Sequence, residues 1–416
     1  MIRKFNIYKD RWGIESRNVI EPGLENVTNA LGKVGNPHLG LNVIHVAGTN
    51  GKGSTITMMN ELLIEHGFTT ACFYSPCFVD VHDQIQMNGV PISSSELDVL
   101  FERAKKAGLS GLLTDFELLT VLAFMAFKDS QSEIILLETG MGGRFDSTNV
   151  ITPLISVIPS ISLEHEQFLG STLSEVANHK AGIIKEGVPV VVGALNQESI
   201  EVIQKESESK HSPLWLLDEE FSLNEGTYKD RKGVTIPNLV IGLKGQHQKL
   251  NAALAIRSII YVLKTFHEEI KPEKVREALQ NSSLQGRFEK VNKKLYLDGA
   301  HNPASIRVLV DTLKEQFPNE SIHFVVGLIK GKNARGILSI LEEIGTTFTF
   351  VDFPDERAMS ARELIKISSA DSKEMTKDPI EVLWKLNYKE GVTIVTGSLY
   401  LLANLREKAV KIFKNI

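Results

Sequence analysis

The sequence has little cysteine and no long apolar run. Its 416 residues contain two cysteines, Cys72 and Cys77, too few to staple a chain of this length, so we expect a reducing compartment, the cytoplasm. The longest apolar stretch, residues 118–127, is far shorter than the roughly 20 residues that span a bilayer, and we interpret it as a buried helix. Residues 1–15 mix charged and apolar side chains and lack the apolar core of a signal peptide.

An excess of charge of one sign is also missing. Lysine and arginine number 46 against 51 acidic residues, a net charge of −5. This balance excludes a basic field over the whole chain, so we expect neither nucleic acid nor membrane as a partner. Hydrophobic residues make up 42% and charged residues 23%, an ordinary globular composition, and the length suggests two or three domains.

Short apolar runs alternate with helical patterns along the chain, which predicts α/β architecture with parallel sheets. In the first part, a strand over residues 41–46 leads into a glycine-rich turn and a helix from about Ser54. Thr172 and Glu175 have the spacing of a capping box and predict the start of a helix that carries Lys180. Further strands are predicted at 133–138, 150–161 and 188–192, only short strands and turns over 193–243, and a long helix over 247–266.

A second α/β series begins with a strand at 295–297 and a helix from about Ala304. Strands at 322–326, 347–351 and 392–396 follow, separated by helical stretches. We therefore predict two domains, residues 1–288 and residues 289–416.

The glycine-rich turn has the composition of a phosphate loop. Glycines let the backbone wrap around phosphate oxygens, and amide N–H groups at a helix N-terminus attract anions. Lys52 would reach the β- and γ-phosphates of ATP, and the Ser54 hydroxyl would face Mg²⁺. The expected ATP-binding residues are Asn50, Gly51, Lys52, Gly53 and Ser54. The loop departs from the common pattern at Val46 and Gly53, so a plain glycine turn is the alternative.

Residues 45–54, His-Val-Ala-Gly-Thr-Asn-Gly-Lys-Gly-Ser, resemble the ATP-binding signature of the folylpolyglutamate synthase and dihydrofolate synthase family, relatives of the Mur ligases. Other blocks resemble that family in the same order, at 137–149, 163–170, 179–185, 245–253, 286–289, 298–303 and 396–400. The resemblance implies a P-loop ATPase domain with a central, mostly parallel sheet, which also binds pteroate. A smaller C-terminal Rossmann-like α/β ligase domain would follow, and the family's usual form is a monomer.

The implied activity is ATP-dependent amide formation. A carboxylate is phosphorylated to an acyl phosphate, and the amine of L-glutamate then displaces phosphate. The acceptor would be dihydropteroate, the glutamate tail of a folate, or both.

The resemblance also implies the catalytic residues, which are Lys52, Glu138, His165 and Lys180. Two Mg²⁺ ions would be held by Ser54, Ser75, Glu138, His165 and Lys180. Glu138 ends a predicted strand, where α/β sheets bind ligands. An isolated histidine such as His165 is more often structural, and imidazole is an unusual ligand for Mg²⁺. Lys180 would be carbamylated by CO₂, with Lys185 as a nearby competitor.

Two further groups of residues are implied. For the nucleotide they are Asn251, Arg287, Asp298 and His301; for the acceptor they are Gly23, Leu24, Thr114, Phe116 and Asp146. A flat pterin needs an aromatic face and a carboxylate that pairs with its N–H groups. The alternatives are core packing for Phe116, a surface ion pair for Arg287 and loop caps for Asp298 and His301.

The chain departs from the family pattern beside the expected folate site. Cys77 replaces a common histidine, and Gln84 and Gln86 replace arginines. Elsewhere in the chain, Gly331 stands where an aspartate is common. Glutamine cannot supply the charge with which arginine binds carboxylates. A Mur-type ligase with a non-folate acceptor therefore stays open as an alternative. A P-loop NTPase without ligase activity is a further alternative, from another functional class.

Overall fold

The computed structural model of the protein describes residues 2–18, 23–385 and 391–413. The chain divides into two compact units. The first contains residues 1–242 and 248–282, and the second contains residues 243–247 and 283–416. The main change of unit, after Ser282, lies a few residues before the expected boundary at residue 288.

An eight-stranded sheet forms the centre of the first unit, in the order β4-β3-β2-β5-β1-β6-β7-β8. The strands from β2 to β8 in this order run parallel, and β3 and β4 add an antiparallel edge. The bounds are β1 Val43–Val46, β2 Thr70–Phe73, β3 Ile85–Met87, β4 Val90–Pro91, β5 Ile134–Glu138, β6 Ile155–Ile158, β7 Val190–Val192 and β8 Leu214–Leu216. The central strand β1 is buried at every residue because neighbouring strands and helices cover it.

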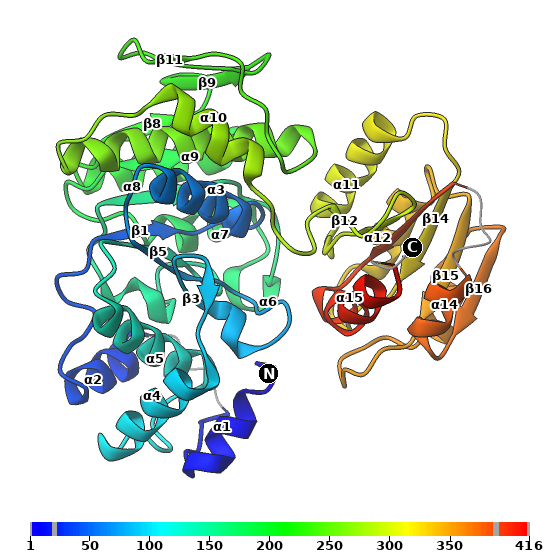
Figure 1. Ribbon diagram of the computed structural model, residues 1–416, viewed down its shortest axis with the longest axis horizontal. Coiled ribbons are helices and arrows are strands. Elements are labelled where there is room, and N and C mark those ends of the chain that lie inside the picture. Colours follow the sequence, from blue (N-terminus) through cyan, green and yellow to red (C-terminus); the bar gives the residue numbers. More distant parts are fainter. Residues whose placement is uncertain (1, 19–22, 386–390, 414–416) are drawn as a thin grey trace. The chain divides into compact units, whose positions relative to one another are not determined.

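Helices lie on both faces of this sheet (Figure 1). On one side are α3 (Lys52–Glu65), α9 (Gln246–Thr265) and α10 (Pro272–Asn281). On the other are α2 (Glu25–Lys33), α4 (Ser94–Lys106) and α5 (Asp115–Ser130). All residues from Leu118 to Phe127 are buried in α5, which confirms the interpretation of this apolar stretch as a buried helix. No helix in the described part of the chain is long and apolar enough to cross a bilayer.

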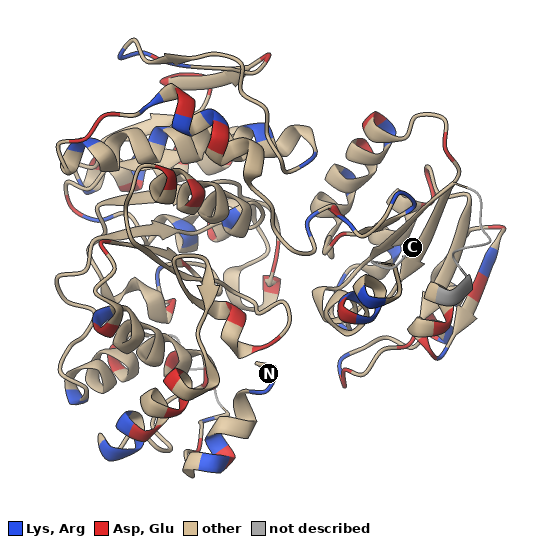
Figure 2. Ribbon diagram, viewed as in Figure 1, with Lys and Arg blue, Asp and Glu red and all other residues tan. Residues whose placement is uncertain are grey.

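The outer helices carry acidic and basic residues side by side rather than one sign of charge (Figure 2). On α4, Lys106 pairs with Glu102 at 2.7 Å, one helical turn away. The N-terminal helix α1 (Phe5–Trp12) is attached to α4 through Asp98, which accepts hydrogen bonds from Arg11 at 2.5 Å and from Trp12 at 2.7 Å.

The helix expected after Thr172 is present as α7 (Leu173–Ala181), and Thr172 and Glu175 form the capping box. The expectation of only short strands and turns over residues 193–243 is wrong, because this segment contains α8 (Gln197–Ser209). Asn196 caps α8, but only a narrow stripe, including Ile203, is buried, so the apolar signal was weak. The strands β9 (Phe221–Asn224), β10 (Thr227–Asp230) and β11 (Thr235–Ile236) follow as a small antiparallel sheet.

The second unit contains a six-stranded sheet in the order β12-β13-β17-β14-β15-β16, parallel except for β12. The strands are β12 Glu289–Lys290, β13 Leu295–Leu297, β14 Ile322–Val326, β15 Thr347–Val351, β16 Lys373–Thr376 and β17 Val392–Thr396. The helices are α11 Pro303–Gln316, α12 Ala334–Leu341, α13 Ala361–Ile367, α14 Pro379–Lys385 and α15 Leu399–Phe413. The four predicted strands are confirmed, and β16, an exposed edge strand, was not predicted.

Candidate active site

The glycine-rich turn connects β1 to α3 and is shaped by its glycines. Gly51 adopts a left-handed conformation, with φ of 85°, at the start of α3. A Cβ atom on Gly51 would lie 2.6 Å from Asn251 Oδ1, and one on Gly48 would lie 3.1 Å from Pro159 Cδ. Glycine is therefore needed at Gly51 for conformation and for space.

A neighbouring segment, residues 160–162, holds this turn in place. The N–H of Thr49 donates to Ser160 O and the N–H of Asn50 donates to Ser160 Oγ, both at 2.9 Å. The Thr49 hydroxyl donates to Ser162 O at 3.0 Å. These bonds fix the turn at the end of β1, where the N-terminus of α3 attracts anions.

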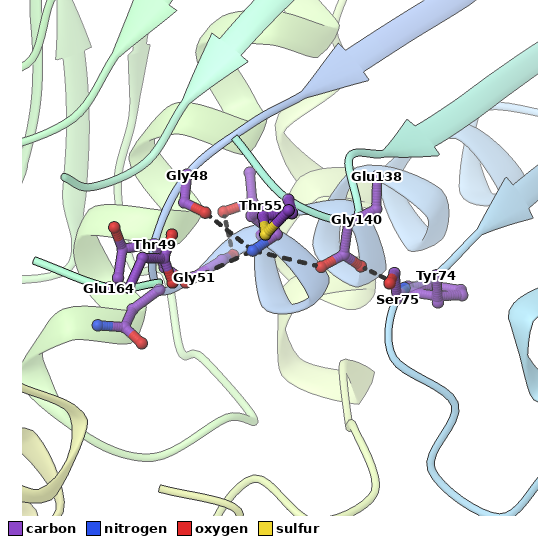
Figure 3. Close-up of polar contacts among 12 residues, drawn as sticks. Gly48, Thr49, Gly51, Thr55, Tyr74, Ser75, Glu138, Gly140 and Glu164 are labelled. Carbon is purple, nitrogen blue, oxygen red and sulfur yellow. Dashed lines mark hydrogen bonds and ion pairs between the residues drawn. The ribbon is translucent and has the colours of Figure 1, made fainter. Parts of the chain in front are cut away.

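Lys52 and Glu138 meet at the turn. Lys52 Nζ donates to Gly48 O at 2.8 Å and lies 3.9 Å from Glu138 Oε1. The other oxygen, Glu138 Oε2, accepts the backbone N–H of Ser75 at 3.2 Å, so that Glu138 lies between the turn and Ser75 (Figure 3). The structure thus brings together three residues predicted from three separate segments of the sequence.

Helix α9 reaches the same region through amide side chains. Gln248 Nε2 lies 3.4 Å from Ser54 Oγ, to which it donates, and Asn251 Nδ2 donates to Gln248 Oε1 at 3.0 Å. All three side chains are buried. Sequence reasoning named Ser54 and Asn251 but missed Gln248, although it lies in the block 245–253 that resembles the family.

Lys180 is completely buried on α7, and its Nζ donates to Glu164 Oε1 at 2.6 Å. Burial lowers the pKa of Lys180 to about 8, although the Glu164 carboxylate favours the charged form. Burial alone would raise the pKa of Glu164, but the charges of Lys180 and Lys52 bring it below its ordinary value. Glu164 was not predicted as a site residue, because only its position next to His165 in the sequence could have indicated such a role.

Lys185 and His165 lie in different surroundings from Lys180. Lys185 is partly buried and donates to Asn149 O at 3.1 Å. His165 is exposed and has a φ of 47° at the start of the one-turn helix α6 (Glu166–Leu169).

The residues expected to bind the acceptor lie in two places: at the start of α5 with the turn after β5, and in the segment just before α2. Thr114 caps α5, and the Phe116 ring packs so closely on Gly140 that a Cβ there would lie 2.5 Å from Phe116 Cζ. Asp146 accepts the N–H of Gly140 at 2.9 Å. Gly23 and Leu24 precede α2, and Leu24 packs against the same apolar core as Phe116.

Of the three nucleotide residues expected in the second unit, Asp298 and His301 follow β13, whereas Arg287 precedes β12. Asp298 accepts the N–H groups of Phe288 at 2.8 Å and Ala300 at 2.9 Å. Burial raises the pKa of the Asp298 carboxyl, and the Arg287 charge opposes that shift. His301 Nδ1 lies 2.8 Å from Gly299 O.

The donor set at the turn fits Mg²⁺. Glu138 offers a nearly buried carboxylate, and Ser54 and Ser75 offer hydroxyl oxygens, the hard ligands that Mg²⁺ prefers. Within the described residues, no group of three or more His, Cys, Asp or Glu side chains could hold a metal ion. Phosphate oxygens would have to complete such a site, as is usual where Mg²⁺ accompanies a nucleotide.

Comparisons with known proteins give two family matches. Residues 46–259 match the Mur ligase middle domain, and residues 280–408 match the dihydrofolate synthetase C-terminal domain. The chain is 34% identical to a dihydrofolate synthase/folylpolyglutamate synthase of Bacillus subtilis, over 94% of this chain and 95% of the relative.

Solved structures are similar over nearly the whole chain. A folylpolyglutamate synthase of Thermotoga maritima has a TM-score of 0.83 and 30% identity, covering 97% of both chains. An Escherichia coli protein in complex with DHPP and ADP has a TM-score of 0.87 and 25% identity, with the same coverage. The predicted fold class, an α/β P-loop domain followed by a smaller α/β domain, is confirmed.

Proposed function

Because the chain belongs to the family of dihydrofolate synthases and folylpolyglutamate synthases, we propose that it joins L-glutamate to a pteroyl carboxylate at the expense of ATP. The acceptor is dihydropteroate, the glutamate tail of a reduced folate, or both. The observation that carries this proposal is the meeting of Lys52, Glu138 and Ser75 at a glycine turn that opens a helix.

The first chemical step is transfer of the γ-phosphoryl group. A carboxylate oxygen of the acceptor attacks the γ-phosphorus of ATP, and the bond to the ADP oxygen breaks. Lys52 and the amides at the start of α3 bind the phosphates and offset the negative charge that spreads over the transferring group. Glu138, Ser54 and Ser75 would hold Mg²⁺, which would offset negative charge on the phosphates.

The second step forms the amide. The neutral amine of glutamate attacks the acyl carbon, the bond to the phosphate oxygen breaks, and the amine loses a proton. Arg287, Asp298 and His301 are assigned to the nucleotide, because a cation and a carboxylate held by backbone amides suit phosphate and ribose.

Lys180 is assigned as the carbamylated lysine, together with His165 as a ligand for a second Mg²⁺. The neutral amine adds to CO₂ and releases one proton, which leaves an N-carboxylate in place of a cation. Complete burial and a pKa lowered to about 8 support this assignment, because only the neutral amine reacts. Lys185 is the weaker candidate, since it is only partly buried and its amine is bonded to a backbone carbonyl.

We also propose that the enzyme acts in the cytoplasm as a monomer on small molecules. Both cysteines are free and buried, as expected for a chain that matures under reducing conditions.

The test is phosphate release from ATP and Mg²⁺ with glutamate, comparing dihydropteroate, a reduced folate monoglutamate and no acceptor. We expect release that requires glutamate and at least one of the two acceptors, and a Lys52→Met variant that lacks it. Dependence on dihydropteroate alone would define a dihydrofolate synthase, and dependence on both would define a bifunctional enzyme.

Two results would contradict the proposal. Glutamate-independent hydrolysis would indicate an NTPase. Turnover with another carboxylate but with neither pteroyl acceptor would indicate a changed acceptor. Gln84 is the residue that such a change would involve: it stands where the family resemblance implies an arginine, is buried, and donates to Tyr74 O at 3.1 Å.

A further inference from the structure

The chain leaves the sheet of the first unit after β2 and returns to it at β3, and residues 75–83 between them are called the Ser75 loop. The two ends of this loop are joined beside the sheet. The N–H of Tyr74 donates to Gln84 O at 2.9 Å, and Gln84 Nε2 donates to Tyr74 O at 3.1 Å. The loop is thus a closed excursion from the sheet, and its outer part needs contacts of its own to be held in place.

The Ser75 loop adjoins residues of both the metal and the acceptor candidates. At its first residue, the N–H of Ser75 donates to Glu138 Oε2 at 3.2 Å. Phe73, at the end of β2, has its ring centroid 5.8 Å from that of Phe116, which the family resemblance assigns to the acceptor. The position of this loop therefore affects the acceptor side of the site.

The outer part of the Ser75 loop is attached to the N-terminal helix α1. The Tyr8 hydroxyl on α1 lies 2.8 Å from His82 Nε2. The N–H of Val81 donates to Arg3 O at 3.1 Å, and Val81 is buried in the same apolar cluster as Tyr8. Polar and apolar contacts to one helix therefore hold this end of the loop.

Asp80 joins these contacts into one network. Its Oδ1 lies 2.6 Å from His82 Nδ1, and its Oδ2 accepts a hydrogen bond from Lys4 Nζ at 2.6 Å. Burial alone would raise the pKa of Asp80, but the hydrogen bonds from Lys4 and His82 bring it below its ordinary value, so the side chain is a carboxylate. The His82 ring therefore carries a proton on Nδ1. When the ring is neutral, Nε2, which also lies 3.3 Å from Ser94 Oγ, accepts the Tyr8 hydroxyl.

Helix α1 is itself fixed to two helices of the first unit. Lys9 Nζ donates to Asp115 Oδ1 at 2.6 Å, and Asp115 immediately precedes Phe116 at the start of α5. Further along α1, Arg11 donates to Asp98 on α4 at 2.5 Å. The helix therefore connects the Ser75 loop to the first turn of α5, which carries Phe116.

We propose that α1 holds the Ser75 loop closed beside the acceptor site, and that Tyr8 and His82 are positioning residues for the acceptor. This inference rests on the proposed function. Without the bond between these two residues, a larger share of the molecules has an open loop, and the apparent acceptor affinity falls with the closed fraction. Ser75 itself stays held by Glu138 and by the joined ends of the loop, so nucleotide affinity should change little.

The experiment breaks the bond between Tyr8 and His82 from each end. Tyr8→Phe removes only the hydroxyl, whereas His82→Asn keeps a donor for Asp80 and removes the acceptor for Tyr8. We expect each variant to raise the acceptor KM about fivefold, as the loss of one hydrogen bond predicts, and to change the KM for ATP by less than about twofold. Because both substitutions act on one bond, the double variant should be no worse than the more affected single variant.

Arg11→Gln is the matched control on the same helix. It removes a contact between α1 and Asp98 but leaves the contacts of the Ser75 loop in place, so its acceptor KM should be close to that of the wild type. An equal rise in KM for Arg11→Gln and Tyr8→Phe would mean that general loosening of α1 is responsible, and it would overturn the proposal.

Cys77 provides a readout that does not depend on turnover, because it is buried in the Ser75 loop. Thiol reagents should label Cys77 about fivefold faster in Tyr8→Phe and His82→Asn than in the wild type or Arg11→Gln, with the labelling of Cys72 unchanged. A ligand that needs the closed loop must in turn stabilise it. In the wild type, a pteroyl acceptor at about ten times its Kd should therefore slow Cys77 labelling about tenfold.

Failure of this inference and failure of the proposed function give different results. If no pteroyl acceptor supports turnover in the wild type, the proposed function fails, and the acceptor role of the loop fails with it. If turnover is normal but Cys77 is labelled at one rate in all variants, Tyr8 and His82 do not hold the loop, and only the inference is overturned. Faster labelling with an unchanged acceptor KM overturns it too, because loop closure would then have no part in acceptor binding.

Discussion

Lys180 combines complete burial with a carboxylate partner at 2.6 Å, and the two influences oppose each other. Burial favours the neutral amine, whereas Glu164 favours the ammonium, and burial has the larger effect on the pKa. A pKa near 8 leaves about a tenth of the amine neutral at pH 7, against well under a thousandth for an ordinary lysine. The residue is therefore able to react with CO₂ near neutral pH.

This reactivity can be measured directly. In ¹³C-bicarbonate, the wild type should show a carbamate carbon signal by NMR that grows as the pH rises from 7 toward 9, because deprotonation supplies the reactive amine. Lys180→Gln should lack the signal and the ligase activity, and Lys185→Gln should retain the signal. A signal that disappears only in Lys185→Gln would move the assignment to that residue.

The contact between Gly140 and Phe116 gives a second prediction for a single residue. In Gly140→Ala the new methyl group must displace the Phe116 ring, since it would lie 2.5 Å from Cζ. We expect the acceptor KM to rise by at least about tenfold, the size of a 1–2 kcal/mol packing defect. Gly32→Ala on α2 is the matched control, because its nearest neighbour, Asn36 Oδ1, is 3.9 Å away. Steady-state kinetics with varied acceptor would detect the difference, and equal KM values in both variants would contradict it.

At the scale of elements, α7 depends on its capping box. The Thr172 hydroxyl oxygen accepts the N–H of Glu175 at 3.2 Å, and the Glu175 carboxylate accepts the N–H of Thr172 at 3.0 Å. Thr172→Ala should reduce the free energy of unfolding by about 1 kcal/mol, and Thr172→Ser should restore most of it. Urea unfolding followed by circular dichroism gives both values, and equal midpoints for the alanine variant and the wild type would contradict the prediction.

The same capping box shows which elements could be predicted from the sequence. Thr172 and Glu175 carry a local signal, as do the apolar run of α5 and the glycine turn before α3. Helix α8 was missed because its buried stripe is narrow and most of its surface faces water. Local sequence patterns therefore predicted the elements that are extensively buried or that begin with a recognisable capping box or glycine turn.

Part of the candidate site could likewise be predicted from the sequence. Lys52, Glu138 and Ser75 were named from separate segments, and the parallel order of β2, β5 and β1 brings those segments together at one edge. Glu164 and Gln248 were not named. Their roles depend on which side chain faces which across elements distant in sequence, and no local spacing encodes that.

At the scale of the whole molecule, the rates at which the two cysteines are labelled distinguish local opening of the first unit from its unfolding. Both are buried, and burial raises the pKa of Cys72 to about 12 and also raises that of Cys77. Cys72 lies on β2, in the interior of the eight-stranded sheet. Cys77 follows β2 in a loop that a local opening would expose. Thiol reagents should thus reach Cys77 by local opening and Cys72 only by unfolding of the unit.

Nucleotide binding should slow the labelling of Cys72 by mass action. A ligand that binds only the folded unit lowers the population of the open state by about a hundredfold when its concentration is 100 times Kd. We expect ADP with Mg²⁺ to slow Cys72 labelling by about that factor and Cys77 labelling by less, as resolved by peptide mass spectrometry. Lys52→Met should lose most of the protection. Equal slowing at both cysteines would mean that they share one opening, and no slowing at Cys72 would place the nucleotide outside the first unit.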